Sequence, residues 1–261
     1  GLSERTLLDL DAPDRSHVLS EDGPRLIGYA QVWPEHVAEL VVDPAFRREG
    51  HGDALWQETV AAGATSVWAH GDLPQARAFA ADHGLVRTRE LHRMERPLTR
   101  HDLTAPELPE GFAVETYATR RNPGELLQLN ARAFAHHAEQ GHLGPEDLAA
   151  RMAAPWFDPA GLLYLVDAKA PRGSGPAAFH WTKRPVETPD RGEVYVLGID
   201  PAYQGRGLAQ PLTRLGLAHL ATVGAHVVEL YVDGDNEAAI RTYRRTGFDI
   251  IATDVVYSLP R

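Results

Sequence analysis

Two turns of the chain place glycines where an apolar run passes into a helical pattern. They read DPAYQGRGLA at residues 200–209 and DPAFRREGHG at residues 43–52. The first N–H groups of a helix are unpaired and carry the positive end of the helix dipole. Because glycine also lets the main chain approach a ligand closely, each turn favours a cradle that holds a pyrophosphate by main-chain N–H groups.

Other phosphate motifs fit these turns less well. A dinucleotide-binding fingerprint needs three spaced glycines and a ribose-binding acid, and a P-loop needs Lys followed by Ser or Thr; neither turn has the full set. A tight strand-to-helix turn without a ligand would explain one such match about as well. Two matches favour a pyrophosphate that carries neither a nicotinamide nor a magnesium-dependent triphosphate.

The two turns belong to a duplicated segment of the sequence. The alignment pairs three stretches: 43–52 with 200–209, 68–85 with 231–248, and 89–98 with 252–260. A repeat of this length indicates two copies of one structural unit, and the segment between them, TRHDLTAPELPEG, is typical of a linker. We therefore expect an N-terminal domain over residues 1–98, a linker at 99–110 and a C-terminal domain over 111–261.

Apolar periodicity predicts an α/β fold with a mixed sheet in each copy. In the second copy we expect strands at 112–117, 162–168, 177–183, 193–199 and 227–232, and helices at 124–135, 144–153, about 206–223 and 236–246. The first copy has the later elements, but only one expected helix, at 3–10, precedes its strands at 17–20 and 25–32. It apparently lacks an opening strand and helix, so we expect the given sequence to begin inside a domain.

The composition is that of a globular protein without thiol chemistry. The 261 residues include no cysteine, which excludes disulfides, a thiol nucleophile and thiolate metal sites. The formal net charge of −10 argues against non-specific nucleic-acid binding. No apolar run reaches the roughly 20 residues of a membrane span, and no signal-peptide pattern is present. We expect a cytoplasmic monomer with neither a nucleic-acid nor a membrane partner.

The order of these features resembles the GCN5-related N-acetyltransferase (GNAT) family. An apolar strand, Asp-Pro, an aromatic residue, Q/R-x-x-G-x-G/A, a long helix, a strand and DNEAAIRTYRRTGF follow one another as in that family. The resemblance implies two tandem GNAT domains and acetyl-CoA as the cofactor. A narrower resemblance, in GEVYVLGIDP, FHWTK, AEQG, WFDP and ELVVDPAFRREGHG, is to the mycothiol synthases, a tandem branch of the family.

The resemblance implies the cofactor contacts of the second copy. Main-chain amides of Leu197 and Ile199 would orient the pantetheine arm and the thioester, and Gly198 between them suits a bulge that splays the strand. Asn236 would cap the short helix beside the cofactor. The residues expected to bind acetyl-CoA are Leu197, Gly198, Ile199, Gln204, Gly205, Arg206, Gly207, Leu208, Ala209, Gln210, Asn236, Glu237, Ala238, Ala239, Ile240 and Arg241.

Direct acetyl transfer to an amine needs a base for the ammonium, a polarised carbonyl and a proton for the departing thiolate. The resemblance suggests Glu193 as the base, acting through water, and Tyr243 as the acid. The aligned residues of the first copy are His36 and Ala80, so the copies differ where the chemistry would occur. The structural alternatives are core packing for Tyr243 and a solvated strand end for Glu193.

The first copy is expected to be non-catalytic, because Ala80 cannot donate a proton and Leu73 stands where the second copy has Asn236. It keeps the glycine turn, so we expect a second acetyl-CoA there. A degenerate copy that serves only for packing is an equal alternative. The residues expected to bind this second cofactor are Leu40, Val41, Val42, Arg48, Glu49, Gly50, His51, Gly52 and Asp53.

The narrower resemblance implies a small thiol-sugar acceptor, the cysteinyl amine of cysteinyl-glucosaminyl-inositol (desacetylmycothiol), with mycothiol and CoA as products. Such a polyol suits carboxylates, a cation and aromatic residues. The residues expected to bind it are Glu4, Glu139, Lys183, Glu193 and Tyr231. Glu4 and Glu139 come from different copies, which would place the acceptor between the domains.

Two other functions are left open. The first is acetyl transfer to another amine, namely an aminoglycoside, a polyamine or a protein N-terminus. Lys183 is unfavourable for a polycationic amine, because its ammonium would repel the charges of that acceptor. A non-catalytic acyl-CoA sensor is the other, and the pair Glu193 and Tyr243 argues against it. Three histidines gather in AFAHHAEQGH, but acetyl transfer needs no metal and we expect none; they are His136, His137 and His142.

Overall fold

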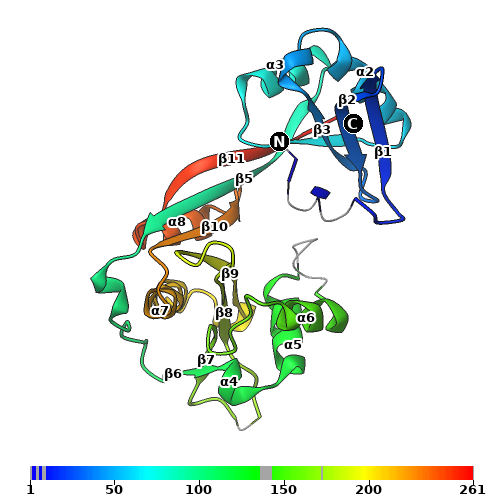
Figure 1. Ribbon diagram of the computed structural model, residues 1–261. Coiled ribbons are helices and arrows are strands. Elements are labelled where there is room, and N and C mark those ends of the chain that lie inside the picture. Colours follow the sequence, from blue (N-terminus) through cyan, green and yellow to red (C-terminus); the bar gives the residue numbers. More distant parts are fainter. Residues whose placement is uncertain (1, 4–5, 8–9, 136–142, 172, 261) are drawn as a thin grey trace. The chain divides into compact units, whose positions relative to one another are not determined.

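The computed structural model describes residues 2–3, 6–7, 10–135, 143–171 and 173–260. The chain forms two compact units (Figure 1). Unit 1 comprises Gly1–His92, Asp233–Asp235 and Ala252–Arg261, and unit 2 comprises Arg93–Val232 and Asn236–Ile251. The units therefore differ from the two sequence segments, since the C-terminal residues belong to unit 1 and the expected linker belongs to unit 2.

Unit 1 contains a mixed sheet with α-helices packed against it. Its elements are β1 (Ser16–Asp22), β2 (Arg25–Val32), β3 (Val37–Val42), η1 (Pro44–Phe46), α2 (His51–Ala61), β4 (Ser66–Ala69), α3 (Pro74–Asp82), β5 (Val86–Pro97) and β11 (Asp249–Ser258). The strand order is β1-β2-β3-β4-β11-β5. β3 and β4 are parallel, whereas the pairs β1–β2, β2–β3 and β4–β11 are antiparallel. β5 and β11 contribute residues to both units.

Unit 2 repeats this arrangement and adds elements before it. Its elements are η2 (Arg100–Leu103), β6 (Phe112–Thr116), α4 (Tyr117–Arg120), α5 (Pro123–Ala133), α6 (Pro145–Ala153), β7 (Leu162–Asp167), β8 (Ala178–Lys183), β9 (Arg191–Ile199), η4 (Pro201–Tyr203), α7 (Ala209–Thr222), β10 (Val227–Asp233) and α8 (Glu237–Arg245). The strand order is β5-β10-β9-β8-β7-β6. β9 and β10 are parallel, and β6 to β9 pair antiparallel.

The expected fold class is confirmed, because each unit has a mixed sheet with one parallel pair at the same place in the order. Among the described residues before β1, only Thr6 and Leu7 are helical and none is in a strand. The described part of the first copy thus shows no opening strand. No helix in the described ranges is both long and apolar enough to cross a bilayer.

The sheet of unit 2 is covered on both faces. On one face, Leu129 of α5 and Leu148 of α6 pack with Trp181 of β8. On the other, Leu217 of α7 and Tyr243 of α8 pack in a separate cluster. The first cluster covers the face that carries Lys183, because Trp181 and Lys183 are two residues apart on β8.

Candidate active site

The parallel strands β9 and β10 pair only over their first residues. Pairing ends at Glu193 and Glu229, although β9 continues to Ile199 and β10 to Asp233. On its other side, β9 still pairs with β8 as far as Ile199. Within the part of the chain that the structure describes, one edge of β9 beyond Glu193 therefore lacks a strand partner. An extended ligand can pair with that edge through the main-chain groups of Leu197 and Ile199.

The turn after β9 has glycine at two positions that require it. Gly205 and Gly207 have φ values of 75° and 74°, in the left-handed region, while a Cβ at either would meet no atom within 4 Å. The glycines are thus needed for backbone conformation and not for space. They also delay α7, which begins at Ala209 and not near Arg206 as expected. No described side chain caps α7, so its first N–H groups suit a pyrophosphate.

The bulge of β9 lies at Tyr195, and the expectation that it lies at Gly198 is wrong. The register of β8 against β9 shifts between Trp181 and Thr182, which leaves Tyr195 as the extra residue. Gly198 pairs regularly with Phe179, and a Cβ there would lie 2.5 Å from the Phe179 ring. Close packing therefore explains this glycine.

Glu193 lies beside Lys183 at the start of β9. The two residues are register partners, and the Lys183 Nζ is 3.4 Å from the Glu193 carboxylate. Lys183 Nζ also lies 5.7 Å from the centre of the Trp156 ring and 5.5 Å from that of Tyr195. The structure thus brings together the residues expected to act as base and acceptor-binding cation, and adds an aromatic frame that sequence reasoning missed.

Tyr231 belongs to the same electrostatic cluster. It is 47% exposed and lies two residues after Glu229, on the same face of β10. Burial of part of its ring, together with the Glu229 charge, raises the pKa of Tyr231, which a hydrogen bond with Arg93 opposes; the Glu193 charge acts on it as well. The expected acceptor residues Lys183, Glu193 and Tyr231 therefore lie on one face of unit 2.

Tyr243 lies on α8 with its ring in the cluster that includes Val194 of β9. Its ring centre is 5.9 Å from that of Phe248. Burial raises the pKa of Tyr243 to about 12, so the phenol is neutral at physiological pH. Among the described residues, none forms a hydrogen bond with its hydroxyl, which leaves this group able to donate to a ligand.

The expected helix cap at the start of α8 is present, while the contacts of α8 with a cofactor stay a prediction. The Asn236 side chain caps the helix by accepting a hydrogen bond from the Ala239 N–H at 3.1 Å. Arg241 donates to Glu237 at 2.9 Å. The rest of the expected cofactor set lies at the end of β9, on the turn after it, on the first turn of α7 or on α8.

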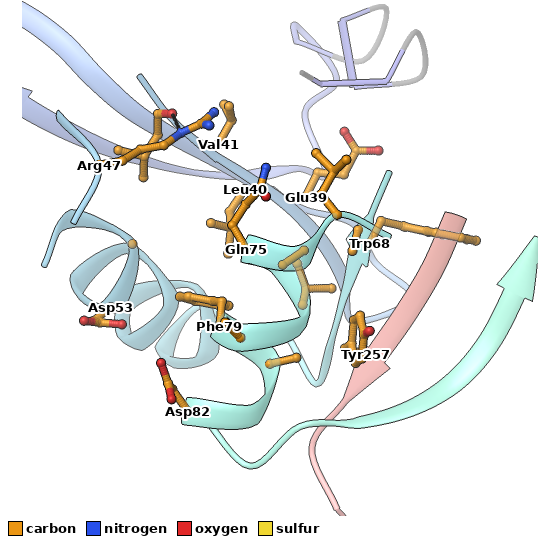
Figure 2. A pocket seen from close by; sticks show the side chains of 18 of the residues that line it. Glu39, Leu40, Val41, Arg47, Asp53, Trp68, Gln75, Phe79, Asp82 and Tyr257 are labelled. Atoms are coloured by element: carbon orange, nitrogen blue, oxygen red, sulfur yellow. Dashed lines mark hydrogen bonds between the residues drawn. The ribbon is translucent and has the colours of Figure 1, made fainter. Parts of the chain in front are cut away.

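Unit 1 has a pocket of about 440 Å³ beside its own glycine turn (Figure 2). The parallel strands β3 and β4 pair only as far as Ala38 and Val67, so they diverge as β9 and β10 do. Gln75 and Phe79 of α3 border the pocket (Figure 2). Of the expected cofactor residues, Glu49 and His51 are not in its lining, whereas these are: Leu40, Val41, Val42, Arg48, Gly50, Gly52 and Asp53.

The glycine turn of unit 1 has the same left-handed backbone conformation as the turn of unit 2, although one glycine is replaced by arginine. Arg48 has a φ of 69° where the aligned Gly205 has 75°, and Gly50 has a φ of 87°. A left-handed non-glycine residue costs roughly 1–2 kcal/mol. Helix α2 begins directly after Gly50, and no described side chain caps it. The turn thus retains a strained conformation that suits anion binding.

A partly buried charged cluster lies at the wall of this pocket, and sequence reasoning missed it. The His70 ring donates from both nitrogens, with Nε2 2.8 Å from the Glu39 carboxylate and Nδ1 3.1 Å from that of Asp254. Hydrogen bonds to Asp254 and Glu39 raise the pKa of His70 to about 9. The available signal was Glu39, a charged residue inside the apolar run AELVV.

Unit 2 holds a second charged cluster that sequence reasoning missed. Arg191 donates to Glu95 and to Glu229, the latter at 3.1 Å. The alternation of Arg191, Glu193 and Tyr195 on an otherwise apolar strand was a signal for a functional face.

Several expected residues lie outside the described ranges, namely Glu4, Glu139, His136, His137 and His142. Among the residues that are described, no three His, Asp or Glu side chains are grouped as metal ligands would be. The first copy has Ala80 buried in its core and Leu73 at the start of α3 without a side-chain cap.

Comparison with protein families gives a match to the acetyltransferase (GNAT) family over residues 2–85 and 125–248. A mycothiol acetyltransferase from Mycobacteroides abscessus is 44% identical over 267 residues, which cover 98% of this chain and 88% of the relative. Another mycothiol acetyltransferase, from Streptomyces coelicolor, is 46% identical over 269 residues, which cover 98% of this chain and 84% of the relative.

Solved structures agree on the fold. A GCN5-related N-acetyltransferase from Sphaerobacter thermophilus has a TM-score of 0.74 at 23% identity, with 97% of this chain and 84% of that chain covered. A tandem GNAT protein from the clavulanic acid biosynthesis pathway has a TM-score of 0.66 at 19% identity, with 95% and 83% covered. The likeness to the second structure extends over nearly the whole of this chain, as two tandem domains require.

Proposed function

Because the chain belongs to the GNAT family of acetyltransferases, we propose that it acetylates the cysteinyl amine of desacetylmycothiol with acetyl-CoA, giving mycothiol and CoA. The relatives named mycothiol acetyltransferase support this choice of acceptor. The observation that carries the proposal is the contact between Glu193 and Lys183 at the point where β9 and β10 separate. In the proposed reaction, Glu193 would be the base, Lys183 would bind the acceptor, and the thioester would lie along the neighbouring edge of β9.

Acetyl-CoA fits the groups that unit 2 offers. The N–H groups of the turn at 204–210 would hold the pyrophosphate, since both glycines there adopt the left-handed conformation. The unpaired edge of β9 would accept the pantetheine arm at Leu197 and Ile199. The N-terminus of α8, capped by Asn236, would border the cofactor on its other side.

In the proposed reaction, the neutral amine nitrogen attacks the acetyl carbonyl carbon, a C–N bond forms and the C–S bond breaks. Glu193 takes the proton that the ammonium loses, directly or through water. Tyr243 donates a hydrogen bond and then a proton to the departing sulfur. The raised pKa of Tyr243, about 12 because of burial, keeps this donor protonated over the working pH range. Once the C–N bond has formed, the nitrogen loses a second proton, which returns to Tyr243 through water and restores the phenol. The products are an amide and a thiol, and Glu193 releases the first proton to solvent.

The acceptor side of unit 2 suits a polyol better than a polyamine. Lys183 and Tyr231 can donate to hydroxyl oxygens, and Trp156 offers an apolar face to a sugar ring. The Lys183 ammonium would repel a second positive charge on the acceptor. Acetylation of an aminoglycoside, a polyamine or a protein N-terminus is therefore the weaker candidate.

Unit 1 would bind a second acetyl-CoA without transferring its acetyl group. Its pocket has about 440 Å³ of space beside the turn at 47–52. However, Ala80 replaces the phenol, and His36 replaces the base. The expected domain limits, the cytoplasmic location and the monomeric state stay predictions.

A thiol-release assay tests the proposed acceptor. The enzyme and acetyl-CoA are incubated in turn with desacetylmycothiol, a polyamine and an aminoglycoside, and free CoA thiol is measured. We expect the highest kcat/KM with desacetylmycothiol. Faster release with either polycationic amine would contradict the assignment of the acceptor, and no release with any amine would favour a sensor.

A further inference from the structure

A row of charged side chains crosses the sheet of unit 2 through Glu193. Lys183 on β8 and Glu229 on β10 are both register partners of Glu193. Neighbouring strands lie about 4.8 Å apart, and registered residues project on the same face. Glu193 is therefore flanked by a cation at 3.4 Å on one side and by a carboxylate on the other.

Arg191 offsets the negative charge of the Glu229 carboxylate with its positive charge. It lies two residues before Glu193, on the same face of β9. Its guanidinium donates to Glu95 of β5 and, at 3.1 Å, to Glu229. The hydrogen bonds that it donates to Glu95 and Glu229 raise the pKa of Arg191, which keeps the guanidinium charged. The Arg191 guanidinium thus pairs with two carboxylates, those of Glu95 and Glu229, close to the proposed base Glu193.

We propose that Arg191 and Glu229 are positioning residues that set the proton affinity of Glu193 and so fix the lower pH limit of acetyl transfer. The inference rests on the proposed function, in which Glu193 is the base. Glu229 disfavours the ionised form of Glu193, Lys183 favours it, and Arg191 cancels most of the repulsion from Glu229.

Other charged or titratable groups reach this face from each neighbouring element. Tyr231 of β10 interacts electrostatically with Glu193 and Glu229 and bonds to Arg93 of β5. The charge of Glu193 also acts on Tyr195 of β9, whose ring lies 5.7 Å from the Arg151 guanidinium of α6. All of these groups remain in place in the variants below, so the predicted changes isolate Arg191 and Glu229.

Substitutions at Arg191 and at Glu229 should shift the pKa of Glu193 in opposite directions. Removing the guanidinium leaves Glu229 and Glu95 without their shared cation, so Glu193 takes up a proton at higher pH. Removing the charge of Glu229 takes away the repulsion, so Glu193 stays ionised to lower pH. At the spacing of adjacent strands, with 15% of the Glu193 side chain and 20% of the Glu229 side chain exposed, each shift in the pKa of Glu193 should be about half to one pH unit.

The test compares the acidic limb of kcat/KM against pH in wild type, Arg191→Met and Glu229→Gln, with acetyl-CoA and desacetylmycothiol. We expect the acidic limb to move to higher pH by about half to one pH unit in R191M, and to lower pH by a similar amount in E229Q. Arg191→Lys keeps a cation and should restore most of the wild-type profile. The matched control is Arg120→Met, because Arg120 also bridges two carboxylates, Glu115 and Glu125, in unit 2.

The limb of R120M should stay within error of wild type even where thermal stability falls. The same shifts should appear without turnover in an NMR pH titration of the Glu193 side-chain carboxyl carbon. Unmoved titration curves in R191M and E229Q, or shifts of the same sign in both, would overturn the inference. Failure of the proposed function would look different, because wild type itself would then transfer no acetyl group while the titration still reports on Glu193.

Discussion

Two buried tyrosines of unit 2 differ in what their hydroxyls can do. Tyr164 is fully buried and its hydroxyl has no partner among the described residues, and burial raises its pKa strongly. Tyr243 packs beside Val194 of β9, next to the residue that we assign as the base. We propose a proton donor's role for the phenol of Tyr243, whereas the unpartnered hydroxyl of Tyr164 lies in the core and costs stability.

We predict that Tyr243→Phe lowers kcat by about 10²- to 10⁴-fold, the range of a general acid, with little change in the Kd of acetyl-CoA. Tyr164→Phe is the matched control and should leave both unchanged. Steady-state kinetics and calorimetric titration measure the two quantities. A Tyr243→Phe enzyme with wild-type turnover would remove this residue from the mechanism.

His70 predicts a pH dependence of stability in unit 1. Its pKa is about 9 in the folded protein because of Asp254 and Glu39, above the ordinary value of about 6.5. Its contribution is therefore complete below about pH 6.5 and is lost as pH rises through 9; we expect about 2 kcal/mol after allowing for partial exposure. Urea unfolding monitored in unit 1 should show this loss, and His70→Gln should flatten it. An unchanged pH slope in His70→Gln would contradict the prediction.

At the scale of elements, the glycine turns were predictable, because left-handed conformations leave a local mark in the sequence at Gly50 and Gly207. The bulge at Tyr195 was not, since a bulge is defined by the register of the partner strand. Gly198 misled the prediction for the same reason: its role depends on contact with Phe179, which lies on another strand.

The two turns can be tested separately by titration with acetyl-CoA. We expect two molecules bound per chain in wild type. Gly50→Ala and Gly207→Ala should each lower this number by one, because an alanine strains the left-handed backbone of the turn. Turnover should disappear in G207A. A single site in wild type that G207A abolishes would show that the turn of unit 1 is vestigial.

At the scale of the whole chain, the sequence revealed the duplication but not which unit its last strand joins. β11 pairs with β4, where Val255 is opposite Ala69 and Ser258 is opposite Ser66. Strand pairing between segments this far apart leaves no periodic mark, so only the structure assigns residues 252–261 to unit 1. The folding of the first copy therefore depends on the end of the second.

A chain that ends after Phe248 should lose stability in unit 1, because β4 and β5 lose the strand between them. We expect amide hydrogen exchange in β4 to rise at least tenfold, the equivalent of about 1.4 kcal/mol. Exchange in β7, remote from β11 in the strand order, is the internal control. Unchanged protection of β4 would contradict the prediction.

Acetyl transfer from acetyl-CoA to the cysteinyl amine of desacetylmycothiol can be tested by mass analysis of the product. The enzyme is incubated with both compounds, and the acceptor is fragmented to locate the added group. We expect one acetyl group on the cysteinyl nitrogen and one CoA thiol released for each product molecule. An unmodified acceptor, or an acetyl group on a sugar hydroxyl, would contradict it.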